Sequence, residues 1–426
     1  MISPGGFQGA SAGRHVAVGA LFALTFDLRL LTSVTRSTTP QIAPVADIAP
    51  LTVPGPSFAR ALWRIAAADV SSGNKVRILR EGTRLFDEMI EAIESAKESI
   101  AFEMYIFRRD ELGRRFVEAL TAATQRGVKT RVLLDWVGRM GTPRRFFEPL
   151  VRAGAQVAYF NPPGFRRWFG LIPRDHRKVL VVDDRVALTG GFGIGVEWQS
   201  GVLKKKRSPW RDTAVWIEGE AAKYLADAFD DMWTRAGMRF RRRRRDHRHV
   251  VRAARGAHID PSVHPPSLVG IIEGVPLRLR VSRALQLQAL AAQNTIWIAS
   301  AYFVPSWSEM EALAGAARDG VDVRVLVPSR YDHPWLRRLT TRLYRRLLRN
   351  GVKLWEWDGE MMHAKSSVID SRWVRIGSTD FNPLGVAINY EIDVIIEDAT
   401  IAREAEAMFL EDLERSKQIT LEKVPR

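Results

Sequence analysis

The sequence of 426 residues contains no cysteine. This absence excludes disulfide bonds, thiolate nucleophiles and cysteine-ligated zinc or iron–sulfur centres. The sequence also lacks an apolar run of the ~18 residues that a membrane-spanning helix needs. The best candidate, Val16 to Phe26, is closed by Asp27 and Arg29, and no small-residue cleavage motif follows that would favour a signal peptide.

Acidic residues are also comparatively few. The chain has 48 Asp and Glu against 64 Lys and Arg, a formal charge of +16. This balance predicts an anionic partner, which is nucleic acid, a membrane surface or a phosphorylated substrate. Codon bias toward arginine is an alternative source of the excess, so charge alone does not choose the partner. Two basic segments, Arg241–Arg245 and an amphipathic helix predicted over Trp335–Arg349, are suited to contact anionic lipid.

The order of predicted helices and strands repeats in the two halves of the chain. The first half shows a helix over 85–97, a strand over 99–107, a helix over 112–125 and a strand over 128–135. The second half shows a strand over 295–303, a helix over 307–318 and a strand over 321–327. Such alternation predicts an α/β fold with two similar lobes. We expect an N-terminal extension and linker over 1–72, a first lobe over 73–237, a basic linker over 238–266 and a second lobe over 267–426.

Each half carries the same sparse motif. The motifs are His176-x-Lys178-x-x-x-x-Asp183 and His363-x-Lys365-x-x-x-x-Asp370. Strand alternation places the His and Lys of each motif on one face. A single copy is compatible with a structural histidine beside an exposed lysine, but two copies at matching places of a repeat favour a reactive site. Lysines supply fixed charge for phosphate oxygens, and histidines supply a nucleophile and an acid–base group without any metal.

The paired motifs resemble those of the phospholipase D superfamily, and the chain is most similar to bacterial cardiolipin synthases of the type without transmembrane helices. The resemblance covers about Gly73 to Met408. Supporting segments include Glu103-Met104-Tyr105-Ile106-Phe107, Pro209-Trp210-Arg211-Asp212-Thr213 and Ala301-Tyr302-Phe303-Val304-Pro305. It implies a phospholipase D-like fold of two pseudo-symmetric α/β/α lobes with mixed sheets, an active site at the lobe interface, phospholipid substrates, and neither cofactor nor metal.

The resemblance also implies a mechanism. One histidine, which we assign as His176, attacks phosphorus and forms a phosphohistidine, while His363 acts as acid and base, although the sequence does not distinguish the two. Lys178 and Lys365 hold the phosphate, and Asp183 and Asp370 stabilise the motifs rather than react. If the acceptor is phosphatidylglycerol the product is cardiolipin, and if it is water the product is phosphatidic acid. The alternatives are a phospholipase D, a nuclease-type phosphodiesterase, or a lipid-binding module whose site has decayed.

A catalytic histidine usually needs a carboxylate that fixes its tautomer. Within the superfamily this group lies downstream of the motif. We therefore expect Glu391 to serve His363 and Asp212 to serve His176, with Glu197 as the second candidate for His176.

Two segments depart from the family pattern, which places Asn after Gly-Ser-x or Gly-Gly-x. The segments are Gly190-Gly191-Phe192-Gly193 and Gly377-Ser378-Thr379-Asp380-Phe381-Asn382. An aspartate beside a phosphate repels it unless the aspartate is protonated or paired. We expect Ser378 and Asn382 to contact the substrate, with Asn382 replacing the usual asparagine.

The surroundings of the site follow from these assignments. Because one chain carries both motifs, a monomer should suffice for the active site. The basic segments predict a peripheral protein on the anionic phospholipid surface of the bacterial inner membrane, on its cytoplasmic side. Nucleic acid is disfavoured as a partner, because no set of basic strands studded with aromatic residues is evident.

Overall fold

The computed structural model describes residues 63–162, 173–199, 208–238, 267–330 and 343–424. The first half contains β1 (Asp69–Arg80), α3 (Thr83–Ser95), β2 (Ser99–Met104), α4 (Glu111–Gln125), β3 (Lys129–Asp135), η2 (Arg144–Phe147), α5 (Glu148–Arg152), β4 (Gln156–Phe160), β5 (Lys178–Val182), β6 (Val186–Gly190), η3 (Val196–Trp198), β7 (Thr213–Glu218) and α6 (Glu220–Arg235). The second half contains β8 (Ser267–Gly274), α8 (Arg280–Ala291), β9 (Thr295–Ser300), α9 (Trp307–Arg318), β10 (Asp322–Pro328), β11 (Lys353–Trp357), β12 (Lys365–Ile369), β13 (Trp373–Gly377), the π-helix η4 (Leu384–Ile388), β14 (Glu391–Glu397), α11 (Ala399–Glu414), β15 (Ser416–Ile419) and η5 (Leu421–Lys423).

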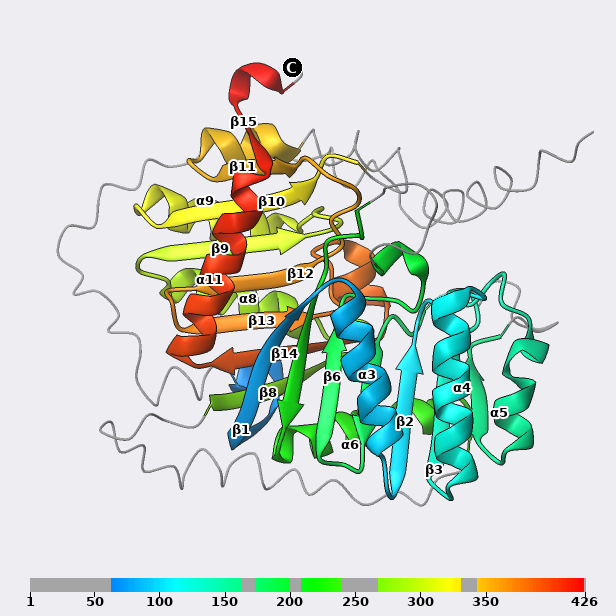
Figure 1. The fold of residues 1–426 in the computed structure, drawn as a ribbon. Helices are drawn as coiled ribbons and strands as arrows, with labels where there is room; N and C mark the ends of the chain where they lie inside the picture. Colours follow the sequence, from blue (N-terminus) through cyan, green and yellow to red (C-terminus); the bar gives the residue numbers. More distant parts are fainter. Residues whose placement is uncertain (1–62, 163–172, 200–207, 239–266, 331–342, 425–426) are drawn as a thin grey trace, which may run out of the picture.

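The strands form one sheet in the order β15-β11-β10-β9-β12-β13-β14-β8-β1-β7-β6-β5-β2-β3-β4. From the β8–β1 junction the strands run β8-β14-β13-β12-β9-β10-β11 in one direction and β1-β7-β6-β5-β2-β3-β4 in the other. Apart from β15, each strand of one half therefore has a counterpart at the same place in the other half, and the two halves are related by pseudo-two-fold symmetry (Figure 1). In each half the outer strands are parallel, β2–β3–β4 and β9–β10–β11, and the inner strands are antiparallel. The predicted α/β fold with mixed sheets is confirmed.

The helices begin and end where the sequence provides caps. Asp110 accepts a hydrogen bond from the Gly113 amide at the start of α4, and Ser306 forms a capping box with Glu309 at the start of α9. These caps satisfy amides that have no partner within the helix. Both helices are followed by a glycine with positive φ, Gly127 at 94° and Gly320 at 95°, a conformation that glycine adopts without strain.

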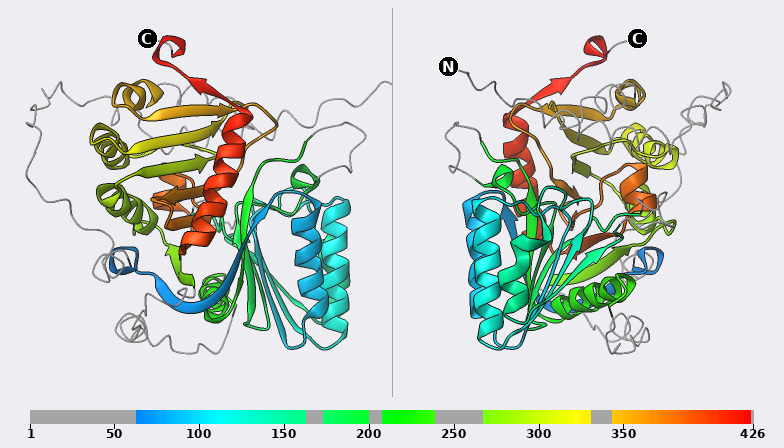
Figure 2. Two further views of the ribbon diagram at one scale, coloured as in Figure 1. Left: turned by 60° about the vertical axis from the view of Figure 1, so that its left-hand side comes forward. Right: turned by 90° about the vertical axis from the view of Figure 1, so that its right-hand side faces the viewer.

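Three apolar cores hold the layers together. One lies under α3 and α4, a second lies under α8 and α9, and the third is shared by both halves beneath α6 and α11. Helix α6 packs on β8 of the other half and α11 packs on β1 of the other half. Figure 2 shows α11 running between the two halves of the sheet. The shared core therefore fixes the lobes relative to one another.

The strand β1 belongs to both lobes. Its residues Asp69–Asn74 pair with β8, and its residues Lys75–Arg80 pair with β7. Val70 lies in this strand, which is preceded by a short helical stretch over residues 63–66. The strand also starts before the lobe boundary expected at residue 73.

Several predicted segments lie outside the described residues. They are the extension up to residue 62, the basic run Arg241–Arg245 and the first part of the predicted basic helix, residues 335–342. Residues 343–349 of that helix are helical, and Leu347 is buried in the second core.

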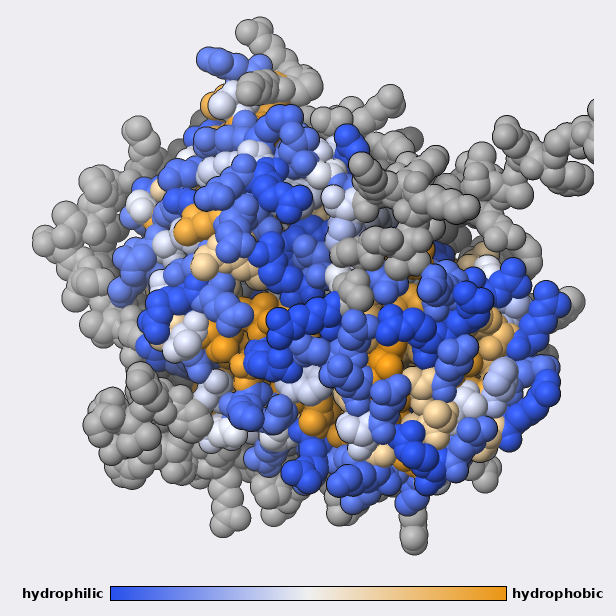
Figure 3. Space-filling view, in the orientation of Figure 1, coloured by the Kyte–Doolittle hydropathy of each residue, from blue (hydrophilic) through white to orange (hydrophobic). Residues whose placement is uncertain are grey.

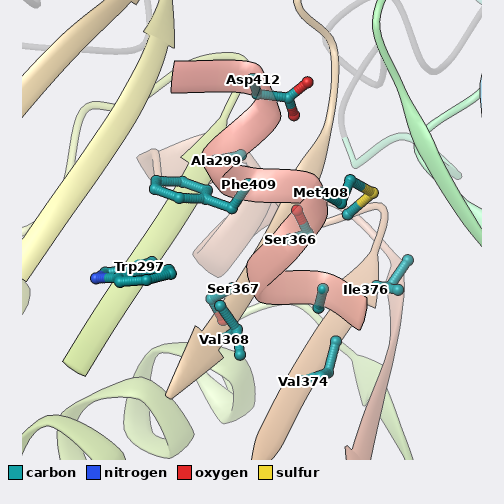
Figure 4. Close-up of a pocket in the computed structure, with 11 residues that line it drawn as sticks. Trp297, Ala299, Ser366, Ser367, Val368, Val374, Ile376, Met408, Phe409 and Asp412 are labelled. Atoms are coloured by element: carbon teal, nitrogen blue, oxygen red, sulfur yellow. The ribbon is translucent and has the colours of Figure 1, made fainter. Parts of the chain in front are cut away.

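Helix α11 leaves little free volume beneath it. The gap that it forms with β9, β12 and β13 measures about 10 Å³ and is lined mainly by apolar side chains such as Trp297, Met408 and Phe409 (Figure 4). A volume of this size holds at most one water molecule, so this layer is packed core. In the part of the chain that the structure describes, no helix has both the length and the apolar character needed to cross a bilayer. The face shown in Figure 3 is mainly hydrophilic with small apolar areas.

Candidate active site

The two motifs meet at the lobe interface through short cross-lobe backbone pairs. His176 and His363 each lie two residues before an inner strand, β5 and β12 respectively. The His176 amide donates to the Tyr390 carbonyl (2.9 Å), and the His363 amide donates to the Arg211 carbonyl (2.7 Å). Tyr390 and Arg211 directly precede Glu391 and Asp212. The backbone thus carries each histidine to the carboxylate of the other half.

The histidine–carboxylate pairs are accordingly crossed between the lobes. His176 Nδ1 lies 3.0 Å from each carboxylate oxygen of Glu391. His363 Nδ1 lies 2.9 Å from Asp212 Oδ2. The expected pairs, His176 with Asp212 and His363 with Glu391, are therefore wrong. The chosen carboxylates are both present, but the cross-lobe backbone pairs exchange them.

The second candidate for His176, Glu197, is also wrong. It lies in η3, and its Oε1 accepts a hydrogen bond from Arg108 Nε at 3.1 Å. This ion pair belongs to the first lobe.

Carboxylate contacts at Nδ1 leave Nε2 of each ring available for chemistry. The side chains of Glu391 and Asp212 are almost completely buried, with exposed fractions of 1% and 0%. The side chain of His176 is 15% exposed and that of His363 is 5% exposed. Of the two rings, His176 is therefore the more accessible to a ligand.

The two lysines have matching environments. Lys178 and Lys365 are each 1% exposed, and each ammonium donates to the carbonyl of the histidine in its own motif. The ammonium of Lys178 lies 5.3 Å from the ring centroid of Tyr105, and that of Lys365 lies 5.7 Å from the ring centroid of Tyr302. Aromatic faces stabilise a cation that has lost its water shell. Tyr105 directly follows β2, and Tyr302 lies two residues after the end of β9, its counterpart in the second half.

Electrostatics distinguish His176. Burial, followed by the positive charges of Lys178, Lys365 and His363, lowers the pKa of His176 well below its usual value. This shift favours the neutral form of the His176 ring near neutral pH. Burial also raises the pKa of Glu391, against the opposing effects of Lys178 and the Ser378 hydroxyl. Both shifts have the same main cause, which is the removal of water from a charged group on burial.

The lysines differ in their charged neighbours. Burial lowers the pKa of Lys178 to about 8. Lys365 Nζ lies 3.3 Å from Asp380 Oδ2, whereas Lys178 has no ion pair among the described residues. Asp380 is thus paired, which is the condition under which a carboxylate is tolerated near a phosphate site.

A tryptophan explains the glycine at position 193. A Cβ atom at Gly193 would lie 2.9 Å from the Trp198 ring, so the indole occupies the space that a larger residue would need. Trp198 is fully buried, and its Nε1 donates to Asp212 Oδ2 at 2.9 Å. Asp212 therefore receives hydrogen bonds from both Trp198 and His363. Trp198 is not among the residues predicted from the sequence, although the unexpected Gly193 followed closely by a tryptophan was a signal.

The substrate contacts predicted for Ser378 and Asn382 stay predictions. The Ser378 hydroxyl donates to Glu391 Oε2. Asn382 Nδ2 donates to the Tyr302 carbonyl at 3.3 Å, and its Oδ1 accepts from the Gly385 amide at 2.9 Å. In this structure both side chains therefore support other parts of the site.

The motif aspartates form turns remote from the histidines. Asp183 accepts hydrogen bonds from the amides of residues 97–99, and Asp370 accepts them from the amides of residues 293–295, all at 2.8–2.9 Å. Both have positive φ, 53° and 51°. Each lysine is the first residue of a five-residue strand and each aspartate directly follows that strand, so the two lie ~16 Å apart. This geometry suits the expected stabilising role and excludes contact with a shared phosphate.

Two buried arginines fasten the interface. Arg177 lies 3.2 Å from Glu273 Oε2 on β8, and Arg211 lies 2.7 Å from Asp412 Oδ2 on α11. Each ion pair joins one lobe to the other. Buried pairs of this kind are costly to break, because removal of one partner leaves an uncompensated charge.

The chain matches the family model "Cardiolipin synthase, PLD-like domain" over residues 89–233 and 287–413. It is 30% identical to the cardiolipin synthase of Listeria monocytogenes serotype 4a over 360 residues, which cover 83% of this chain and 72% of that protein. It is also 30% identical to cardiolipin synthase A of Pseudomonas aeruginosa over 373 residues, 85% of this chain and 72% of that one.

Solved structures support the fold. The phosphatidylserine synthase of Haemophilus influenzae superimposes with a TM-score of 0.66 and 15% identity, over 87% of this chain and 93% of that chain. The polyphosphate kinase of Porphyromonas gingivalis superimposes with a TM-score of 0.53 and 14% identity, over 82% and 49%. At these identities the likeness concerns the fold alone. The family model, the two relatives at 30% identity and the paired His-Lys motifs show that the chain belongs to the cardiolipin synthase family of phospholipase D-like enzymes.

Proposed function

We propose that this enzyme transfers a phosphatidyl group between two phosphatidylglycerol molecules to give cardiolipin and glycerol, with His176 as the nucleophile. The observation that carries the proposal is the crossed pair of buried His–carboxylate contacts beside two buried lysines. The pKa of His176, lowered by burial and by neighbouring positive charge, makes this ring the free base. Family membership supports the choice of donor and acceptor.

In the first step, Nε2 of His176 attacks the phosphorus of the donor lipid. A P–N bond forms, the P–O bond to glycerol breaks, and His363 gives its proton to the departing glycerol oxygen. Lys178 and Lys365 offset the charge that gathers on the phosphoryl oxygens. Glu391 orients the attacking ring through Nδ1.

In the second step, a hydroxyl group of the second phosphatidylglycerol gives its proton to His363 and attacks phosphorus. The P–N bond breaks, cardiolipin leaves, and both histidines return to their starting protonation states. Asp212 holds His363 in the tautomer that both proton transfers need. Ser378 and Asn382 would act at the margin of this centre as substrate contacts.

Mass spectrometry of lipids tests the reaction directly. Purified enzyme incubated with phosphatidylglycerol vesicles, with and without phosphatidylethanolamine, should produce cardiolipin, and glycerol should appear in equal amount. Phosphatidic acid alone would contradict the synthase proposal and leave a phospholipase D. Metal-independent cleavage of labelled DNA, without lipid turnover, would instead favour a nuclease-type phosphodiesterase.

The location proposed for the enzyme is the cytoplasmic face of the inner membrane, where it would bind as a monomer to anionic phospholipid. The net charge of +16 supports attraction to such a surface. Cell fractionation with a high-salt wash tests this, because a peripheral protein held by charge is released from the membrane fraction as ionic strength rises.

A further inference from the structure

Two leucines in the loop between β8 and α8 have strained backbone angles and exposed apolar side chains. Leu277 and Leu279 have φ of 64° and 50°, in the left-handed region where a leucine is strained. Leu277 is 81% exposed, and Leu279 is 37% exposed. Leu279 also occupies the N-cap position of α8, where it supplies no side-chain hydrogen bond. Neither stability nor solubility accounts for leucine at these positions, and such local conflicts occur mainly at functional sites.

The pseudo-symmetric turn of the first lobe has none of these features. There, β1 ends at Arg80 and α3 starts at Thr83, so two residues make the connection. One of them is Gly82, whose φ of 111° is unstrained for glycine. The longer apolar loop is therefore a property of the second lobe and not a requirement of the fold.

The loop starts directly beside the active site. Gly274, the last residue of β8, is paired in register with Glu391, the carboxylate that holds His176. A Cβ atom at Gly274 would lie 2.7 Å from Glu391 Cβ, which shows how closely the two backbones approach. Leu277 follows three residues later, so its Cα lies within ~11 Å of Gly274.

The surroundings of the loop combine apolar and basic groups. The Leu277 amide donates to the Ala387 carbonyl of η4 at 2.7 Å, and this π-helix also presents the partly exposed Leu384 and Ile388. Arg278 and Arg283 are exposed beside the leucines and form no ion pair with the described residues. Exposed aliphatic side chains flanked by unpaired arginines match the interface of an anionic bilayer, with its apolar interior and negative headgroups.

We propose that Leu277 and Leu279, with the adjoining surface of η4, insert into the surface of an anionic phospholipid bilayer and hold the active site at headgroup depth. The inference deepens the proposed function, on which it rests, by naming the surface through which lipid reaches His176. The arginines bind headgroup phosphates while the leucines enter the acyl region. A lipid can then reach the site without leaving the membrane.

Substitution by asparagine separates membrane binding from folding. Asparagine tolerates positive φ and is a good N-cap, so L277N/L279N should melt at or above the temperature of the parent enzyme. Vesicles of phosphatidylcholine and phosphatidylglycerol in a 3:1 ratio are the probe, and flotation measures binding. We expect the double variant to bind at least about tenfold more weakly. Activity on vesicles should fall with binding, while turnover of a soluble short-chain phosphatidylglycerol should fall less than twofold.

Leu290 provides the matched control. It is 72% exposed on α8, about 15 Å along the helix from the loop, and L290Q removes a leucine whose exposure lies between those of Leu277 and Leu279. Its vesicle binding should equal that of the parent. Equal vesicle binding by L277N/L279N and the parent would overturn the proposal. If binding is unchanged but L277N/L279N loses a dimer that the parent forms, the surface binds a second copy of the chain instead of a bilayer. If L277N/L279N loses binding but no enzyme makes cardiolipin, the docking surface stands and the proposed function fails.

Discussion

The two halves of the molecule share a motif and a fold, but they support their histidines differently. In the first half, Asp212 is fixed by the indole of Trp198, and glycines fill the turn after β6. In the second half, Glu391 is fixed by the hydroxyl of Ser378, and Asp380 is paired with Lys365. Because the pairs are crossed, the first-half support serves His363 and the second-half support serves His176. Similar motifs thus acquire distinct surroundings, and the difference comes from their neighbours and not from their own residues.

Removal of the histidines should have the largest effect and should separate the two roles. We expect His176→Ala to lower turnover by roughly 10⁴-fold or more and to form no covalent adduct with radiolabelled phosphatidylglycerol. His363→Ala should be similarly slow with natural lipid. With a phosphatidyl p-nitrophenol donor, whose leaving group needs no proton, it should still release a burst of nitrophenol. A burst from His176→Ala instead would reverse the assignment.

Substitution of the carboxylates tests the crossed pairing. Loss of the group that fixes a catalytic tautomer costs about 10²–10⁴-fold in rate. With the nitrophenol donor, Glu391→Gln should slow the burst because it disturbs His176, whereas Asp212→Asn should keep the burst and slow the subsequent steady state. Pairing within each lobe would produce the opposite result.

The pH dependence should reflect the lowered pKa values of His176 and Lys178. His176 acts unprotonated, so kcat/KM should be retained as the pH falls through the usual range of histidine near 6.5 and be lost only well below it. Lys178 acts protonated, so kcat/KM should fall as the pH rises through about 8, approaching tenfold per pH unit. A profile of kcat/KM reports the free enzyme and therefore these values. An alkaline limb near pH 10 would contradict the proposed role of buried Lys178.

Trp198→Phe should have a smaller effect, confined to the His363 side. It keeps a smaller aromatic ring at this position but removes the indole N–H that donates to Asp212. A bond to a charged group corresponds to about 1.5–3 kcal/mol, or about 10–100-fold in the steady-state rate, with the nitrophenol burst preserved. Trp216→Phe is the control, because Trp216 Nε1 donates to Glu218 Oε1 at 3.1 Å outside the site. Equal effects of the two variants would reject a positioning role for Trp198.

The smallest effect on chemistry is expected from the motif aspartates. Asp183→Ala and Asp370→Ala each remove a carboxylate that binds three backbone amides in a left-handed turn. Each should lower the free energy of unfolding by about 2–3 kcal/mol, measured by urea denaturation, while activity per folded molecule stays near that of the parent. The asparagine variants should lose less. A large loss of kcat in stably folded protein would show instead that these aspartates take part in catalysis.

Local patterns predicted much of the fold. The helices after Asp110 and Ser306 have caps, and glycines end them, so the sequence contains their limits. The repeated order of strands and helices predicted two similar lobes, because this order is also contained in local sequence patterns. In each motif the apolar residues between Lys and Asp likewise form a buried strand, which begins at the lysine.

The pairing between lobes was not accessible from such patterns. Whether Asp212 meets His176 or His363 depends on two backbone pairs between segments about 150–215 residues apart, and the motif spacing is the same in either arrangement. Trp198 was missed for a related reason, because a tryptophan near a short helix resembles ordinary core. Its role is visible only when Asp212 and Gly193 are in place beside it.

The strand β1 sets a further condition on how the enzyme takes in its substrate. Its first part is paired with β8 and its second part with β7, so one sheet runs without interruption through both lobes. Separation of the lobes would break the backbone hydrogen bonds of this sheet. It would also separate His176 from Glu391 and His363 from Asp212. The continuous sheet therefore favours lobes that stay fixed relative to one another, so that both histidine–carboxylate pairs keep their geometry before and after a lipid binds.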